Sequence, residues 1–134
     1  MEVKTFNFQI HGDSRGKLVA VETLKDIPFE VKRCYYMWDT TEEVTRGKHA
    51  HKQLEQVLIC VHGKCKILMD DGHHKEIVEL SDPSVGLYIK GLIWREMFDF
   101  SNDAVLMVLA SDYYNEKDYI RSYDDFIKCV ESGE

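Results

Sequence analysis

The stretch that decides the fold and the chemistry of this chain is Arg46-Gly47-Lys48-His49-Ala50-His51-Lys52-Gln53-Leu54-Glu55-Gln56, which runs into the apolar segment Val57-Leu58-Ile59-Cys60-Val61. Successive side chains of a β-strand point to opposite faces. The pattern therefore predicts that His49, His51, Gln53 and Glu55 share one face. Two imidazoles and a carboxylate on one face are either ligands for a divalent metal or groups that transfer protons.

Composition restricts the class of protein. The 134 residues suit a single domain, 1–134, and a hydrophobic content of 44% predicts a packed core. The net charge of −7 argues against binding to nucleic acid or to an anionic membrane surface. No apolar run reaches the length of a membrane span, and Met1–Phe6 lacks the apolar core of a signal peptide, so we expect a cytoplasmic location.

Basic residues gather near the segments that carry chemistry, although the protein is acidic as a whole. A local basic cluster of this kind favours a small anionic ligand over a polyanion, with ordinary surface charge as the alternative. Its members are Arg15, Lys17, Lys32, Arg33, Arg46, Lys48 and Lys52.

Short apolar runs separated by turn signals predict an all-β fold, an antiparallel jelly-roll barrel. His62-Gly63 and Asp70-Asp71-Gly72 are two of the turns, since glycine permits a tight reversal. Apolar residues near helical spacing predict a short C-terminal helix within 117–130. The expected strands are Thr5–Ile10, Lys17–Glu22, Val31–Trp38, Glu55–Val61, Lys64–Met69, Lys75–Leu80, Val85–Ile89, Trp94–Phe98 and Ala104–Ser111.

The histidine spacing resembles the first motif of the cupin superfamily, with His49, His51 and Glu55 as possible metal ligands. The second cupin motif should add a histidine on a later strand, and Arg95 stands at that position. A guanidinium has no lone pair to offer a metal and repels a dication. We therefore expect no metal and no cofactor, and we favour proton transfer by His49 and His51, with Arg95 stabilising an enediolate.

Several ordered segments resemble the dTDP-4-keto-6-deoxyglucose 3,4-ketoisomerases, over about residues 8–123. The resemblance implies a homodimeric cupin isomerase that acts without a metal on a dTDP-linked keto-deoxyhexose. It also implies a role in making 3-amino-3,6-dideoxy sugars for bacterial lipopolysaccharide or surface layers. The segments are Asp13–Ala20, Val31–Tyr36, Arg46–Lys52, Gln56–Cys60, Val85–Ile89, Trp94–Phe100 and Val108–Tyr114.

The implied reaction moves the ketone from C4 to C3 through an enediol. We expect His49 to remove the C3 proton and His51 to carry a proton between the two oxygens. Arg33 and Arg46 are candidates for the diphosphate, because guanidinium groups form paired hydrogen bonds with phosphate oxygens. Tyr35 and Tyr88 could stack on thymine or bind a phosphate or a sugar hydroxyl, with a place in the barrel core as the alternative.

Product stereochemistry depends on two further substrate-binding candidates, Arg15 and Arg95. The resemblance implies Arg and His at these positions in galacto-type enzymes, and Tyr and Arg in gluco-type enzymes. This chain combines Arg15 with Arg95. Because residue 95 offers no imidazole proton donor, we expect the gluco product.

Three other functions remain open from the sequence. One is a metal-dependent cupin enzyme that uses His49, His51 and Glu55. Another is a dTDP-sugar 3,5-epimerase, which also abstracts a proton beside the C4 ketone but inverts carbons. The last is a sugar-nucleotide binding module without catalysis.

Overall fold

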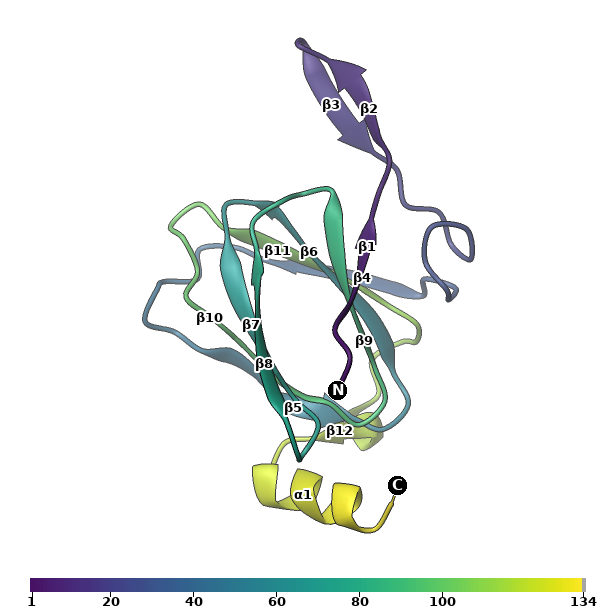
Figure 1. Ribbon diagram of the computed structural model, residues 1–134, viewed down its shortest axis with the longest axis vertical. Helices are drawn as coiled ribbons and strands as arrows, with labels where there is room; N and C mark the ends of the chain where they lie inside the picture. Colours follow the sequence, from purple (N-terminus) through teal and green to yellow (C-terminus); the bar gives the residue numbers. More distant parts are fainter. Residues whose placement is uncertain (134) are drawn as a thin grey trace.

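The computed structural model describes residues 1–133 and shows two antiparallel sheets that face each other as a jelly roll (Figure 1). The fold predicted from the apolar runs is confirmed. The first sheet has the order β1 (Lys4–Asn7), β9 (Val85–Lys90), β6 (Glu55–His62), β11 (Val105–Ala110) and β4 (Arg33–Met37). The second has the order β12 (Tyr119–Ile120), β5 (Arg46–His51), β10 (Trp94–Phe98), β7 (Cys65–Asp70) and β8 (Lys75–Leu80).

Three apolar clusters hold these layers together. The largest fills the space between the two sheets, where residues such as Leu58, Ile67 and Leu106 are completely buried. A second lies on the outer face of the first sheet, where Phe8 and Phe29 pack against Val57. The third joins Ala50 and Trp94 of the second sheet to the C-terminal helix. Apolar packing thus holds both faces of β6 and the Ala50 face of β5, the strands that carry the histidine stretch and its continuation.

The C-terminal helix is shorter than the sequence predicts. A 3-10 turn, η1 (Glu116–Asp118), precedes β12, and α1 spans Tyr123–Glu131. Strand β12 pairs with β5, so these residues are extended, and Ser122 then caps the helix by accepting a hydrogen bond from the Asp125 N–H at 3.3 Å. In the described part of the chain, no helix has the length and apolarity that a bilayer crossing requires.

The N-terminal hairpin, β2 (Ile10–Asp13) and β3 (Gly16–Val19), projects away from the barrel (Figure 1). The predicted strand Thr5–Ile10 is therefore split. The chain leaves the first sheet after β1, and the N–H of Phe8 donates to the Ser84 carbonyl at 2.8 Å before the hairpin begins. The side chains of Ile10 and Leu18 are exposed on this hairpin.

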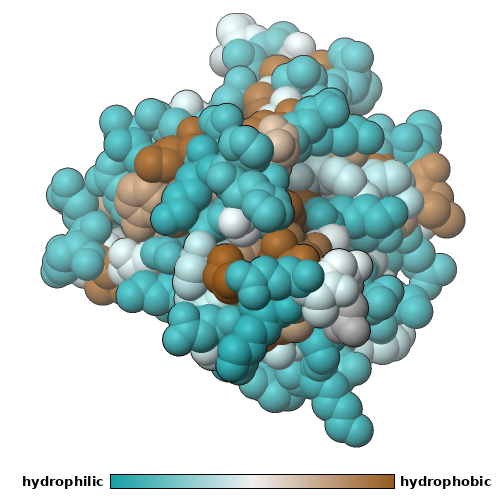
Figure 2. Space-filling view, turned by 60° about the horizontal axis from the view of Figure 1, so that its bottom comes forward, coloured by the Kyte–Doolittle hydropathy of each residue, from teal (hydrophilic) through white to brown (hydrophobic). Residues whose placement is uncertain are grey.

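The end of the molecule that carries α1 is mostly hydrophilic, and its apolar side chains lie in small separate groups (Figure 2). Single exposed apolar side chains are normal on a globular surface, whereas contiguous apolar patches mark interaction sites. This view therefore gives no reason to place an interface at the helix end.

Candidate active site

The two histidines of the opening motif lie side by side on the inner face of β5. Their ring centroids are 4.8 Å apart, and both rings contact Tyr119, at 5.0 Å for His49 and 4.3 Å for His51. Ala50, between them, points to the opposite face and joins the cluster under α1. The prediction that His49 and His51 share a face is confirmed.

A β-bulge at Gly47 sets the angle at which β5 presents these rings. Gly47 has a φ of +78°, and the register with β10 shifts there. A Cβ at this position would lie only 3.2 Å from the Met97 sulfur. Glycine is required here for both reasons.

The predicted continuation of the histidine strand to Glu55 is wrong. Strand β5 ends at His51, and Glu55 begins β6 in the other sheet. Its carboxylate accepts a hydrogen bond from the Tyr88 hydroxyl instead of joining the histidines. Among residues 1–133, no group of three His, Cys, Asp or Glu side chains is arranged to hold a metal ion.

Arg95 lies opposite His49 in the β10–β5 pairing and is completely buried. Its guanidinium donates to the Gln56 side-chain oxygen and, at 2.9 Å, to the Ile93 carbonyl. The Gln56 amide in turn donates to the Tyr35 hydroxyl at 3.1 Å. A continuous hydrogen-bonded chain therefore runs from Arg95 across the barrel to β4, and it fixes a buried positive charge beside the histidines.

This environment keeps both imidazoles neutral. Burial, followed by the charge of Arg95, lowers the pKa of His49 to about 3 and that of His51 to about 2. Burial also lowers the pKa of Arg95 to about 10, which still leaves it protonated at neutral pH. The Nε2 atoms of His49 and His51 are buried, and neither has a hydrogen-bond partner within the described residues. Two neutral imidazoles thus present Nε2 atoms without partners beside a fixed cation, and neutral imidazoles can accept protons from a bound molecule.

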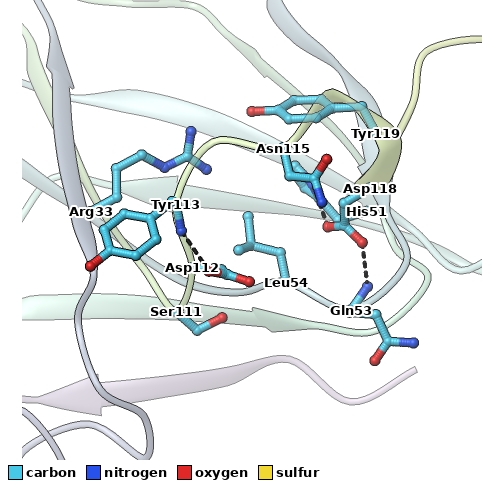
Figure 3. A pocket seen from close by; sticks show the side chains of 10 residues that line it. All are labelled: Arg33, His51, Gln53, Leu54, Ser111, Asp112, Tyr113, Asn115, Asp118 and Tyr119. Atoms are coloured by element: carbon cyan, nitrogen blue, oxygen red, sulfur yellow. Dashed lines mark hydrogen bonds and ion pairs between the residues drawn. The ribbon is translucent and has the colours of Figure 1, made fainter.

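Two adjoining cavities reach the histidines. One, of about 330 Å³, is lined by His49 together with Arg33, Tyr35, Arg46 and Arg121. The other, of about 190 Å³, is lined by His51, Arg33 and residues of the segment that follows β11 (Figure 3). Arg33 and Tyr119 border both cavities.

The structure brings together six of the eight site residues predicted from the sequence. His49, His51 and Arg95 form the buried centre, and Arg33, Tyr35 and Arg46 surround the larger cavity. Arg33, Tyr35 and Met37 share a face because they alternate along β4.

The other two predicted residues lie elsewhere. Tyr88 is on the outer face of the first sheet, where its ring packs with Phe6 at 5.6 Å and Phe29 at 6.5 Å. This half-buried position lies away from the histidines, and the Tyr88 hydroxyl donates to Glu55. Arg15 lies at the tip of the projecting hairpin, where its side chain is 90% exposed and pairs with Asp13 at 2.7 Å.

Three residues at the site escaped the sequence analysis: Asp118, Tyr119 and Arg121. All three lie in the segment that was predicted as part of the helix. Tyr119 is sandwiched between the histidine rings and the Arg121 guanidinium, which lies 4.4 Å from its ring centroid. The pairing of β12 with β5 brings this segment to the histidines. No local sequence pattern predicts a contact such as that between His51 and Asp118, which are 67 residues apart in sequence.

Comparison with known proteins shows the family of this chain. A family profile described as FdtA, WxcM-like, C-terminal, matches residues 1–131. A TDP-4-oxo-6-deoxy-α-D-glucose 3,4-oxoisomerase from Aneurinibacillus thermoaerophilus is 55% identical over 130 residues, which are 97% of this chain and 94% of that protein.

Solved structures agree as well. A 3,4-ketoisomerase from Helicobacter canadensis superposes with a TM-score of 0.94 and 51% identity, over 98% of each chain. The sugar 3,4-ketoisomerase QdtA from Thermoanaerobacterium thermosaccharolyticum, solved with TDP, gives a TM-score of 0.95 and 49% identity, over 98% of this chain and 96% of that one. The resemblance stated from the sequence is confirmed: this chain is an isomerase that belongs to the FdtA, WxcM-like family of sugar 3,4-ketoisomerases.

Proposed function

We propose that this protein converts dTDP-4-keto-6-deoxy-D-glucose to the dTDP-3-keto-6-deoxy hexose with gluco configuration. The observation that carries the proposal is the pair of neutral, buried imidazoles beside the fixed charge of Arg95. Their Nε2 atoms have no hydrogen-bond partner among the described residues. The Aneurinibacillus relative is named for this TDP-sugar, and QdtA was solved with TDP. Both names support the substrate.

The geometry supports a mechanism by proton transfer. The C4 ketone acidifies the C3 hydrogen, His49 removes it as a proton, and the electron pair forms an enediolate that the Arg95 charge stabilises. His51 takes the proton of the C3 hydroxyl and delivers it to the C4 oxygen. C4 then takes up a proton from solvent on the face opposite to His49, which gives the gluco configuration and leaves the ketone at C3. His49 releases the C3 proton to solvent, so no atom other than hydrogen moves.

The larger cavity suits the diphosphate. Arg33 and Arg46, the predicted phosphate ligands, line it together with Arg121, and none of the acidic side chains among residues 1–133 lines it. Guanidinium groups bind phosphate oxygens through paired, charge-assisted hydrogen bonds. Tyr35, in the same wall, keeps its predicted role of contacting the substrate.

Residue 95 supports the gluco configuration. The chain carries Arg95 at this position, where the resemblance implies an arginine in gluco-type enzymes and a histidine in galacto-type enzymes. The 3-keto product suits a later transamination at C3, and the proposed place of the enzyme is therefore the synthesis of 3-amino-3,6-dideoxy sugars for lipopolysaccharide or surface layers. The cytoplasmic location expected from the sequence remains a prediction.

We also propose a homodimer in which the hairpin of one subunit reaches the site of the other. The exposed side chains of Tyr36, on edge strand β4, and Trp38, just after that strand, have rings 6.0 Å apart and offer an apolar surface for a second copy. Arg15 is remote from the cavities of its own subunit, so its predicted role in substrate binding requires the partner. Mixing Arg15→Ala with His49→Asn subunits should restore part of the activity, because one of the two mixed sites is then intact. Failure to recover any activity in a verified mixed dimer would contradict this arrangement.

The reaction is tested by incubating the protein with dTDP-4-keto-6-deoxyglucose in heavy water and following the sugar by NMR. We expect a 3-keto product with deuterium at C4 and a large H4–H5 coupling in unlabelled solvent, which marks the gluco configuration. Deuterium only at C3 and C5, or no turnover, would refute the proposal, and a small coupling would assign the galacto product.

The two histidines are tested separately. His49→Asn and His51→Asn should each abolish turnover while the affinity for dTDP, measured by calorimetry, stays within a few-fold. The reason is that the phosphate-binding arginines remain in place. A near-normal rate in either variant would show that its histidine does not transfer a proton.

A further inference from the structure

The carboxylate of Asp118 ties the histidine strand to the segment that closes the site. Its Oδ2 lies 3.2 Å from the His51 Nδ1, and its Oδ1 accepts a hydrogen bond from the Gln53 N–H at 2.9 Å (Figure 3). The main-chain carbonyl of Asp118 also accepts from the Lys52 N–H at 3.1 Å. Asp118 therefore contacts the His51 ring once and the turn that follows His51 at two points.

These contacts determine which His51 nitrogen carries the proton. An ionised carboxylate is an acceptor only, so the His51 Nδ1 must be the donor. The Nε2 atom of a neutral imidazole then bears the lone pair. That Nε2 is buried and lacks a partner in residues 1–133, which leaves its lone pair available to a bound molecule.

We propose that Asp118 is a positioning residue for the 3,4-ketoisomerase reaction. It holds His51 as the Nδ1–H tautomer with Nε2 as the proton acceptor, and it stabilises the imidazolium that forms when Nε2 takes the hydroxyl proton. This inference rests on the proposed function for the identity of the proton that moves. The tautomer itself is a property of the free protein.

The surroundings of His51 explain why such a partner is required. Burial and the positive charges of Arg95, Arg33 and Arg121 all disfavour the charged imidazole and lower the pKa of His51. Asp118 places a carboxylate in contact with the opposite side of the ring, and its side chain is only 17% exposed. A carboxylate that is held in place can orient an imidazole and offset the charge that forms during proton transfer.

A purely structural role for Asp118 makes a different prediction. If its carboxylate only fastened the turn through Gln53, replacement by Asn would be nearly silent, because the amide oxygen can accept the same hydrogen bond. Asn would, however, direct an NH2 group at the His51 Nδ1 and so favour the Nε2–H tautomer. The substitution Asp118→Asn thus distinguishes a residue that only holds the turn at Gln53 from one that also sets the tautomer of His51.

The experiment compares the full-length wild type with Asp118→Asn. Nitrogen-15 NMR of the imidazole should show the Nδ1–H tautomer for His51 in the wild type and the Nε2–H tautomer in the variant. The kcat on dTDP-4-keto-6-deoxyglucose should fall about 10²- to 10³-fold, with KM within a few-fold. The matched control is Asp103→Asn, because Asp103 pairs with His62 at 3.3 Å on the exposed surface, and it should change neither parameter.

Three results would overturn the inference: an Nε2–H tautomer for His51 in the wild type, an unchanged tautomer in the variant, or an unchanged kcat. The wild-type spectrum decides the first of these even if the variant fails to fold. A wild type that shows the Nδ1–H tautomer but does not convert the sugar would refute the proposed function and leave the positioning intact.

Discussion

Acidification should destabilise this protein through its two buried histidines. His49 is 9% exposed and His51 is completely buried, and their pKa values fall from 6.5 to about 3 and about 2. In the unfolded chain both take up a proton near pH 6.5, whereas in the folded protein both stay neutral. The unfolded state therefore binds more protons below that pH, and the free energy of unfolding decreases as the pH falls from about 7 toward 3.

The size of the effect follows from linkage. At pH 5, about 1.5 units below the ordinary pKa, each neutral histidine costs the folded state about 2 kcal/mol, so the pair costs about 4 kcal/mol. Urea unfolding at pH 7, 6 and 5 measures this loss. The double variant His49→Asn/His51→Asn should lose about 4 kcal/mol less than the wild type between pH 7 and pH 5.

The control for this measurement is His11→Gln, which removes an exposed histidine on the projecting hairpin and should keep the wild-type pH dependence. If the double variant and the wild type lose stability in parallel, the histidines are charged or solvated in the folded protein. The assignment of neutral imidazoles would then be wrong.

Three further substitutions test the architecture of the site. Gly47→Ala should lower the free energy of unfolding by about 1–3 kcal/mol. The loss should exceed that of Gly91→Ala, because both glycines have a positive φ but only Gly47 also faces a side chain. Equal losses in urea unfolding would show that packing at Gly47 is unimportant. Gln56→Leu should cost about 2–3 kcal/mol by leaving the buried Arg95 without one partner, and a loss below 1 kcal/mol would contradict this. Glu55→Gln should leave turnover within a few-fold in the same NMR assay, whereas a loss comparable to that of a histidine variant would revive the metal hypothesis.

Much of the barrel could be predicted because local sequence patterns indicate its strands. Lys75–Leu80 and Trp94–Phe98 match β8 and β10 to the residue, since each is a short run with clear turn signals on both sides. The predicted strand boundaries are wrong where pairing with residues distant in sequence determines them. The stretch from His51 to Glu55 reads as one strand but turns, because Glu55 pairs with Lys90 in the first sheet while His51 pairs with Tyr119 in the second.

The candidate site, like the fold, has one part that local sequence patterns predicted and another that they did not. The alternation of residues along β5 placed His49 and His51 on one face, and Arg95 identified a position where a metal ligand is missing. These conclusions needed only the period of a strand and the chemistry of the side chains.

The sequence by itself thus determined the jelly roll, the histidine pair and the family of the protein. The tertiary structure alone decided which groups act on that pair: Tyr119 against both rings, Asp118 at the His51 Nδ1, and Tyr88 outside the site. The physical reason is that periodicity fixes the direction of a side chain within its own strand. Neighbours across the barrel are set by sheet pairing and by loops, whose contacts span most of the chain and leave no local pattern.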